Sequence, residues 1–109
     1  MAITTKVLGQ LNPSAATLST LFTVPALTST VVSTLVICNR SAVPTSFRIA
    51  IRPTGEAIND KHYLYYDVLI DGNDSFAATL GITLATTDVV SVYATLATLS
   101  FNLFGQEIS

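Results

Sequence analysis

The segment Phe47-Arg48-Ile49-Ala50-Ile51-Arg52-Pro53 has the clearest two-residue periodicity in this sequence. Phenylalanine or isoleucine occupies every second position, and two arginines and an alanine stand between them. Because successive side chains of a β-strand point to opposite faces, this pattern predicts a strand with one buried face. Pro44 before it and the turn Pro53-Thr54-Gly55 after it mark where the strand begins and ends.

Short segments of the same kind lie on both sides of this strand, and turn residues separate them. We predict further strands over residues 3–11, 17–24, 30–39, 62–70, 75–80, 88–95 and 98–104. A short helix at 15–21 is the alternative for one segment, but its β-branched residues and Pro25 disfavour it. About eight strands at spacings of about 8–12 residues predict one all-β domain over 1–109, an antiparallel β-sandwich or a jelly-roll-like barrel.

Two predicted hairpins and one predicted core complete this fold. We expect segments 62–70 and 75–80 to pair across the turn Asp71-Gly72-Asn73-Asp74, and 88–95 to pair with 98–104. Residues 81–87 are interpreted as a link. Alternate residues of four strands are expected to face the core: Leu35, Ile37, Phe47, Ile49, Ile51, Val90, Val92, Leu99, Phe101 and Leu103.

The composition favours strands and gives little support to charged ligands. Of 109 residues, 34 are valine, isoleucine or threonine, and 16 threonines and 10 serines supply most of the polarity. Only 11% of the chain is charged, and the net charge of −2 indicates neither nucleic acid nor an anionic membrane as a partner. The N-terminal segment lacks the apolar run of a secretory signal, and no apolar run is long enough for a transmembrane helix.

Charge is concentrated in the middle of the chain. Nine of the twelve charged residues lie between Arg40 and Asp74, whereas residues 7–39 and 89–105 have none. A small monomer ordinarily distributes charge over its surface, so long neutral strands indicate a surface that protein neighbours cover. We therefore expect a homo-oligomer, with a threonine-rich monomer as the alternative.

Residue types suited to catalysis are few. Cys38 is the only cysteine and is expected to pack as a small hydrophobe, and His62, the only histidine, is expected at an exposed strand edge. The residues Asp71, Asn73 and Ser75 have the spacing that opens a calcium loop, but the glycine and the glutamate of that motif are missing. These features predict a non-enzymatic protein without a metal or another cofactor.

The polar middle of the chain, together with the N-terminal strand, is the predicted partner-binding region. Arg48 and Arg52 share one strand face, where they either pair with Glu56, Asp60 or an acidic neighbour or remain solvated. Tyr63 and Tyr65 are expected on one face of their strand, with Tyr66 on the other. Residues 1–11 are expected to add to a neighbouring sheet edge. The predicted contact residues are Lys6, Arg48, Arg52, Glu56, Lys61, His62, Tyr63 and Tyr65.

Several stretches resemble small all-β virion proteins of tailed bacteriophages. In that group a strand leads to a Leu-x-x-x-Asp-x-Val-x-Val-x-Ala segment, which matches residues 84–94 here. The last strand of the group ends in a Phe-x-x-x-Gly-x-Glu-like tail, as in Phe101-Asn102-Leu103-Phe104-Gly105-Gln106-Glu107. The Asn39-Arg40-Ser41 turn and the strand at 47–53 are also similar, so the resemblance extends from about Thr30 onward.

This resemblance implies a structural role in a virion, assembled in the host cytoplasm, and no catalytic residues. It implies a symmetric homo-oligomer, with a trimer favoured, bound to other virion proteins such as the major capsid or tail proteins. A capsid decoration or cement protein is the leading hypothesis, and a neck or tail accessory protein is the alternative within the group. Outside the group, a carbohydrate- or receptor-binding β-sandwich would use Tyr63, Tyr65, Asp67 and the turn 71–74, and a hydrolase is the weakest hypothesis.

Overall fold

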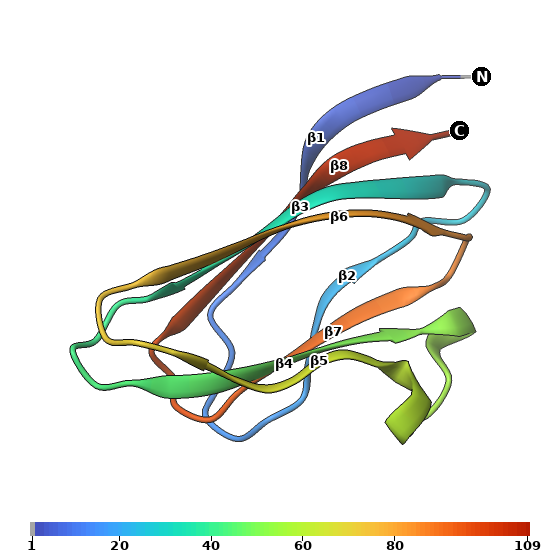
Figure 1. Cartoon of the computed structure of the whole chain (residues 1–109). Helices are drawn as coiled ribbons and strands as arrows, with labels where there is room; N and C mark the ends of the chain where they lie inside the picture. The colour runs from blue at the N-terminus through green and yellow to red at the C-terminus, as the bar shows by residue number, and fades with distance from the viewer. Residues whose placement is uncertain (1) are drawn as a thin grey trace.

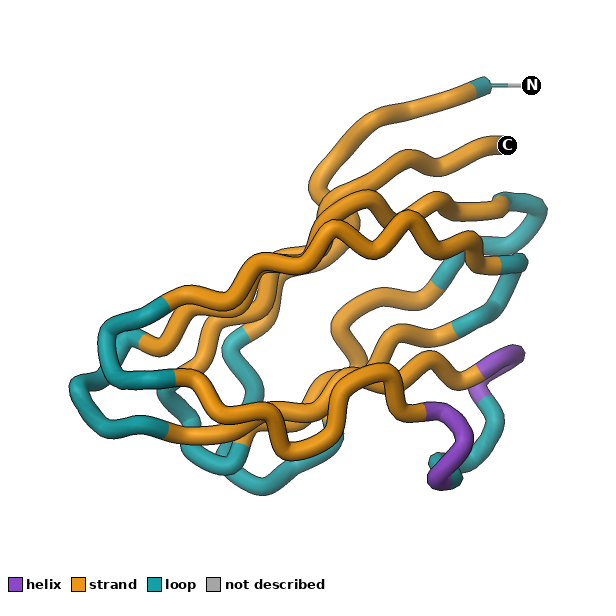
Figure 2. Tube along the Cα trace, viewed as in Figure 1, coloured by secondary structure: helices purple, strands orange, loops and turns teal. Residues whose placement is uncertain are grey.

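Two four-stranded antiparallel sheets pack face to face in the computed structural model, which describes residues 2–109 (Figure 1). Sheet 1 has the strand order β1-β8-β3-β6, and sheet 2 has the order β2-β7-β4-β5. Two short 3₁₀ turns, η1 and η2, lie between β4 and β5 (Figure 2). The prediction of an all-β sandwich is therefore confirmed.

The strands follow the predicted segments closely. Their bounds are β1 Ile3–Leu11, β2 Ser19–Thr23, β3 Ser29–Asn39, β4 Thr45–Arg52, β5 Tyr63–Ile70, β6 Ser75–Leu84, β7 Val89–Ala94 and β8 Leu99–Ile108, with η1 at Pro53–Gly55 and η2 at Asp60–His62. β6 extends to Leu84, into residues 81–87, the segment interpreted as a link. Gly81, with a φ of 62°, lies where the pairing of β6 with β3 shifts register, so the strand passes through an irregularity there and does not end. No helix within residues 2–109 is long and apolar enough to cross a lipid bilayer.

Large side chains of both sheets meet in one core. Nine of the ten predicted core residues are buried, and Ile51, at the end of β4, is partly buried against them. The ring centroid of Phe47 lies 6.4 Å from that of Phe101 and 5.2 Å from that of Phe76. Contacts between aromatic rings of facing sheets therefore hold the middle of the sandwich together.

Both predicted hairpins are wrong, because each joins strands of different sheets. β5 belongs to sheet 2 and β6 to sheet 1, and the same holds for β7 and β8. The turn between β5 and β6 instead packs on the turn after β3. Buried Asn39 donates to the carbonyl oxygens of Val43 and Asp71, and the Asn73 amide donates to the carbonyl oxygen of Ser41. Turn residues thus mark where a strand ends without showing which sheet the chain enters next.

The N-terminal strand is part of the domain's own sheet. β1 pairs with β8 from Ile3 opposite Ile108 to Leu11 opposite Phe101, and the two ends of the chain lie side by side (Figure 1). Leu8 lies at an irregularity between Val7 and Gly9 and is buried. The prediction that residues 1–11 pair with a neighbouring protein and not with this domain is therefore wrong for the edge of β1 that pairs with β8. The outer edge of β1 has no strand partner in the described part of the chain.

Candidate functional site

The outer face of sheet 1 carries no charged side chain. Residues directly opposite each other in a sheet share a face, and the buried pair Ile37 and Phe101 identifies the inner one. The register then places eighteen residues outward: Ile3, Thr5, Val7, Gln10, Ser29, Val31, Thr34, Val36, Cys38, Ser75, Ala77, Thr79, Thr83, Ser100, Asn102, Phe104, Gln106 and Ile108. We call this set the neutral face.

Apolar side chains lie in two directly opposed pairs where β1 meets β8 on the neutral face, and threonines continue the Val7–Phe104 row into β3 and β6. Val7 and Phe104 form one pair, and Val7 is 45% exposed. Ile3 is 56% exposed where β1 and β8 curve away from sheet 2 (Figure 1). Unlike most exposed strands, this surface has no lysine or glutamate to oppose association with another protein. Within residues 2–109, the outer edges of β1 and β6 are also without a strand partner.

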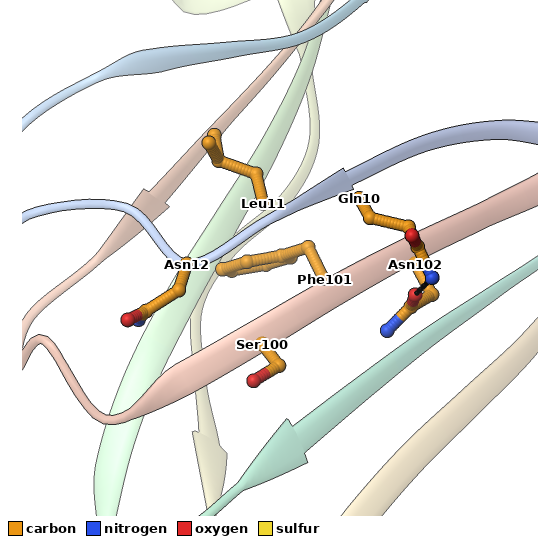
Figure 3. Close-up of a pocket in the computed structure, with 6 residues that line it drawn as sticks. All are labelled: Gln10, Leu11, Asn12, Ser100, Phe101 and Asn102. Atoms are coloured by element: carbon orange, nitrogen blue, oxygen red, sulfur yellow. Dashed lines mark hydrogen bonds between the residues drawn. The ribbon is translucent and has the colours of Figure 1, made fainter.

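A shallow hollow of about 370 Å³ lies at one end of the neutral face. Figure 3 shows its lining from the end of β1 and the start of β8. The side-chain amide of Gln10 donates to the Asn102 side-chain oxygen over 2.7 Å, and Asn12 donates to the carbonyl oxygens of Ala97 and Leu99. These hydrogen bonds fix the Gln10 and Asn12 side chains within the chain.

The outer face of sheet 2 has the opposite chemistry, because an arginine and aromatic rings dominate it. The Arg48 guanidinium lies 4.2 Å from the ring centroid of Tyr66 and 4.3 Å from that of Tyr93. Its Nε donates to the Asp67 carboxylate over 2.6 Å. That hydrogen bond raises the pKa of Arg48 above its ordinary value. Arg48 is thus a permanently charged residue fixed between two rings.

The predicted faces of the tyrosines in β5 are wrong. Tyr65 points inward and packs on Phe47 at 6.3 Å between ring centroids, whereas Tyr63 and Tyr66 meet on the outer face at 4.9 Å. The pairing of β5 with β4 shifts register twice, before and after Tyr65, and Asp67 has a φ of 52°. Each irregularity interrupts the two-residue alternation, so counting by two assigns the faces incorrectly.

His62 is buried, which contradicts the predicted exposed strand edge. It ends η2, its Nδ1 accepts from the Asn59 amide over 3.0 Å, and its Nε2 lies 3.2 Å from a Glu56 carboxylate oxygen. Because Nδ1 accepts, the proton of neutral His62 lies on Nε2 and is donated to Glu56. The Asn59 side chain accepts from the Lys61 amide and completes the cap. His62 therefore holds the loop in place and is not positioned to contact a partner.

Of the other predicted contact residues, Arg52 and Glu56 are in contact, whereas Lys6 lies far from them on the other sheet. Lys6 pairs with Glu107 over 3.0 Å at the end of sheet 1 and remains half exposed. Arg52 donates to Ser91 and to the carbonyl oxygens of Gly55 and Glu56, so it pairs with neither predicted carboxylate. The structure thus brings Arg48 and Tyr63 to one face and leaves Lys6 on the other sheet.

Tyr93 was missed in the sequence, and Asp67 was expected only as a contact of the carbohydrate-binding alternative, not as the partner of Arg48. Tyr93 comes from β7 and joins Arg48 only through the pairing of β4 with β7, and Asp67 reaches Arg48 only because of the irregularity in β5. The alternation in β7 could have placed Tyr93 outward, but not beside Arg48. Among residues 2–109, no three histidine, cysteine, aspartate or glutamate side chains gather in a way that could hold a metal ion.

Comparison with known proteins finds no protein family that matches this chain and no curated protein sequence that is similar to it.

Proposed function

We propose that this chain is a non-enzymatic structural protein of a tailed-phage virion. The observation that supports it most directly is the neutral face. Eighteen outward residues without a charge, with the apolar pairs Val7–Phe104 and Ile3–Ile108 among them, suit burial against other protein better than contact with water. The resemblance of strands and turns to small virion proteins supplies the finer assignment. A capsid decoration or cement protein is its preferred form, and a neck or tail accessory protein is the alternative.

The contact surface of this proposal is the neutral face rather than the charged loop between β4 and β5. In that loop His62 is buried, Glu56 is paired with it, and Arg52 is bound to backbone oxygens. Charged groups that are satisfied within the chain offer a partner little new interaction energy. Lys6 is likewise paired, with Glu107, and the exposed side chain of Lys61 remains available for secondary contacts.

The sheet edges support a closed ring of copies. Sheet 1 ends in two different strands, β1 and β6. Pairing β1 of one copy with β6 of the next is a head-to-tail contact, which closes into a ring when the rotation allows it. A trimer is the favoured ring, as the resemblance implies.

Purified particles of the virus that encodes this chain provide the direct test. Mass spectrometry of the particles should detect the chain at a stoichiometry that matches a symmetric position, and density mapping should place it on the capsid, neck or tail. In that map, the neutral face should lie against protein. Absence of the chain from purified particles would overturn the proposal.

A further inference from the structure

The outer face of sheet 2 carries a hollow that is lined by two tyrosines and a carboxylate. Tyr63 and Tyr66 stand nearly perpendicular, with an interplanar angle of 85° and ring centroids 4.9 Å apart. Together with Asp60 they line an open hollow of about 460 Å³. This volume lies within the range of small-molecule sites, about 300–1,000 Å³. The hollow therefore has the size and the mixed apolar and polar lining of a ligand site.

The Tyr66 ring and the backbone that carries Asp60 are held in place before any ligand arrives. Tyr66 is stacked on Arg48, which is also bound by Tyr93 and Asp67. Asp60 opens η2, the turn that is capped by Asn59 and closed by buried His62. A site whose side chains are already ordered loses less conformational entropy on binding.

The charges around the hollow decide which ligand fits. An anion would approach the Asp60 carboxylate, which is an acceptor and repels it. The Asp60 carboxylate would attract a cation, but two positive groups oppose it: Arg48 already lies 4.2 Å from the centroid of Tyr66, and Lys61 follows Asp60 in the chain. A neutral ligand with apolar C–H groups for the rings and hydroxyl donors for the carboxylate meets neither obstacle.

From this arrangement we propose that Asp60, Tyr63 and Tyr66 form a binding site for a neutral sugar. The C–H face of the sugar ring packs on the tyrosines, and its hydroxyl groups donate to Asp60. The site lies on the sheet opposite the neutral face, so a chain docked through the neutral face presents it outward. The inference does not depend on that docking, because the isolated chain contains every residue of the site.

The experiment uses the isolated chain with glucose, galactose, mannose, N-acetylglucosamine and their trisaccharides. Saturation-transfer NMR detects weak binding, and tyrosine fluorescence reports it directly because the chain has no tryptophan. We expect at least one neutral sugar to bind with a dissociation constant of about 1–10 mM, as a shallow site allows. Asp60→Asn and Tyr63→Ala should each weaken that binding by about tenfold or more.

Leu69→Ala is the matched control, because Leu69 is 77% exposed on the outer face of the same strand and lies outside the hollow. It should leave sugar binding unchanged. Asp60→Asn preserves side-chain size, so it keeps the test valid if Tyr63→Ala does not fold. Three results would overturn the inference: no signal from any neutral sugar, stronger binding of choline or sialic acid, or sugar binding that survives both site variants. Failure here would leave the virion proposal untouched, since that rests on the neutral face.

Discussion

Val7 of β1 lies directly opposite Phe104 of β8 on the neutral face, and both are apolar on a surface without charge. This pair lies between the outer edge of β1 and the centre of sheet 1, where a neighbouring protein would cover it.

A single lysine on the neutral face should disrupt assembly. Thr79 is exposed on β6, and Thr79→Lys adds a charge that a contact with another copy would have to desolvate. We expect the wild-type chain to sediment as an oligomer, with a trimer favoured, and Thr79→Lys to sediment near the 11.5 kDa of one chain. Analytical ultracentrifugation at tens of micromolar measures this.

Thr20→Lys is the matched control, because Thr20 is exposed on β2, in the other sheet. This variant should assemble like the wild type. If both variants dissociate equally, an added charge on either sheet weakens assembly. If the wild-type chain is a monomer, copies of the chain contact one another only on the particle or not at all.

The core and the outer face of β4 should differ sharply in their contribution to stability. Phe47 is fully buried against Phe76 and Phe101, so Phe47→Ala should lower the free energy of unfolding by about 3–5 kcal/mol. Arg48→Ala removes one partly exposed ion pair and two ring contacts, and should cost only about 1–2 kcal/mol. Urea unfolding of both variants checks the difference, and similar losses would contradict the face assignment.

Deleting residues 1–11 should destabilise the domain itself. β1 covers the edge of β8 along its whole length and buries Leu8, so its loss exposes both the β8 backbone and the core beneath it. We expect the melting temperature, followed by circular dichroism, to fall by at least about 10 °C. A truncated chain that melts like the wild type would mean that β1 adds no stability to sheet 1.

Substitution of two neighbouring residues of η2 should affect stability to very different extents. His62→Ala removes a buried side chain together with the acceptor of the Asn59 amide, and should cost about 1–3 kcal/mol. Lys61→Glu changes an exposed side chain and should leave the melting temperature almost unchanged. Thermal melts of both variants measure this, and a stable His62→Ala variant would show that the cap contributes little.

The sequence by itself determined the strands and most of the core. Alternation at Phe47, Ile49 and Phe101 depends only on the two-residue repeat of an extended chain, so local pattern was sufficient to find them. The neutral stretches at 7–39 and 89–105 were also visible in the sequence, as an absence of charge.

Only the tertiary structure decided how these pieces combine. The turn at Asp71–Asp74 could lead either to a hairpin or to the other sheet, because turn residues specify a reversal and the packing of the sheets specifies the destination. Irregularities in β5 moved Tyr65 inward and Tyr63 beside Tyr66. Strand pairing brought the uncharged outward residues of β1, β8, β3 and β6 together on one face. Strands that are distant in sequence become neighbours only when long-range hydrogen bonds form between them.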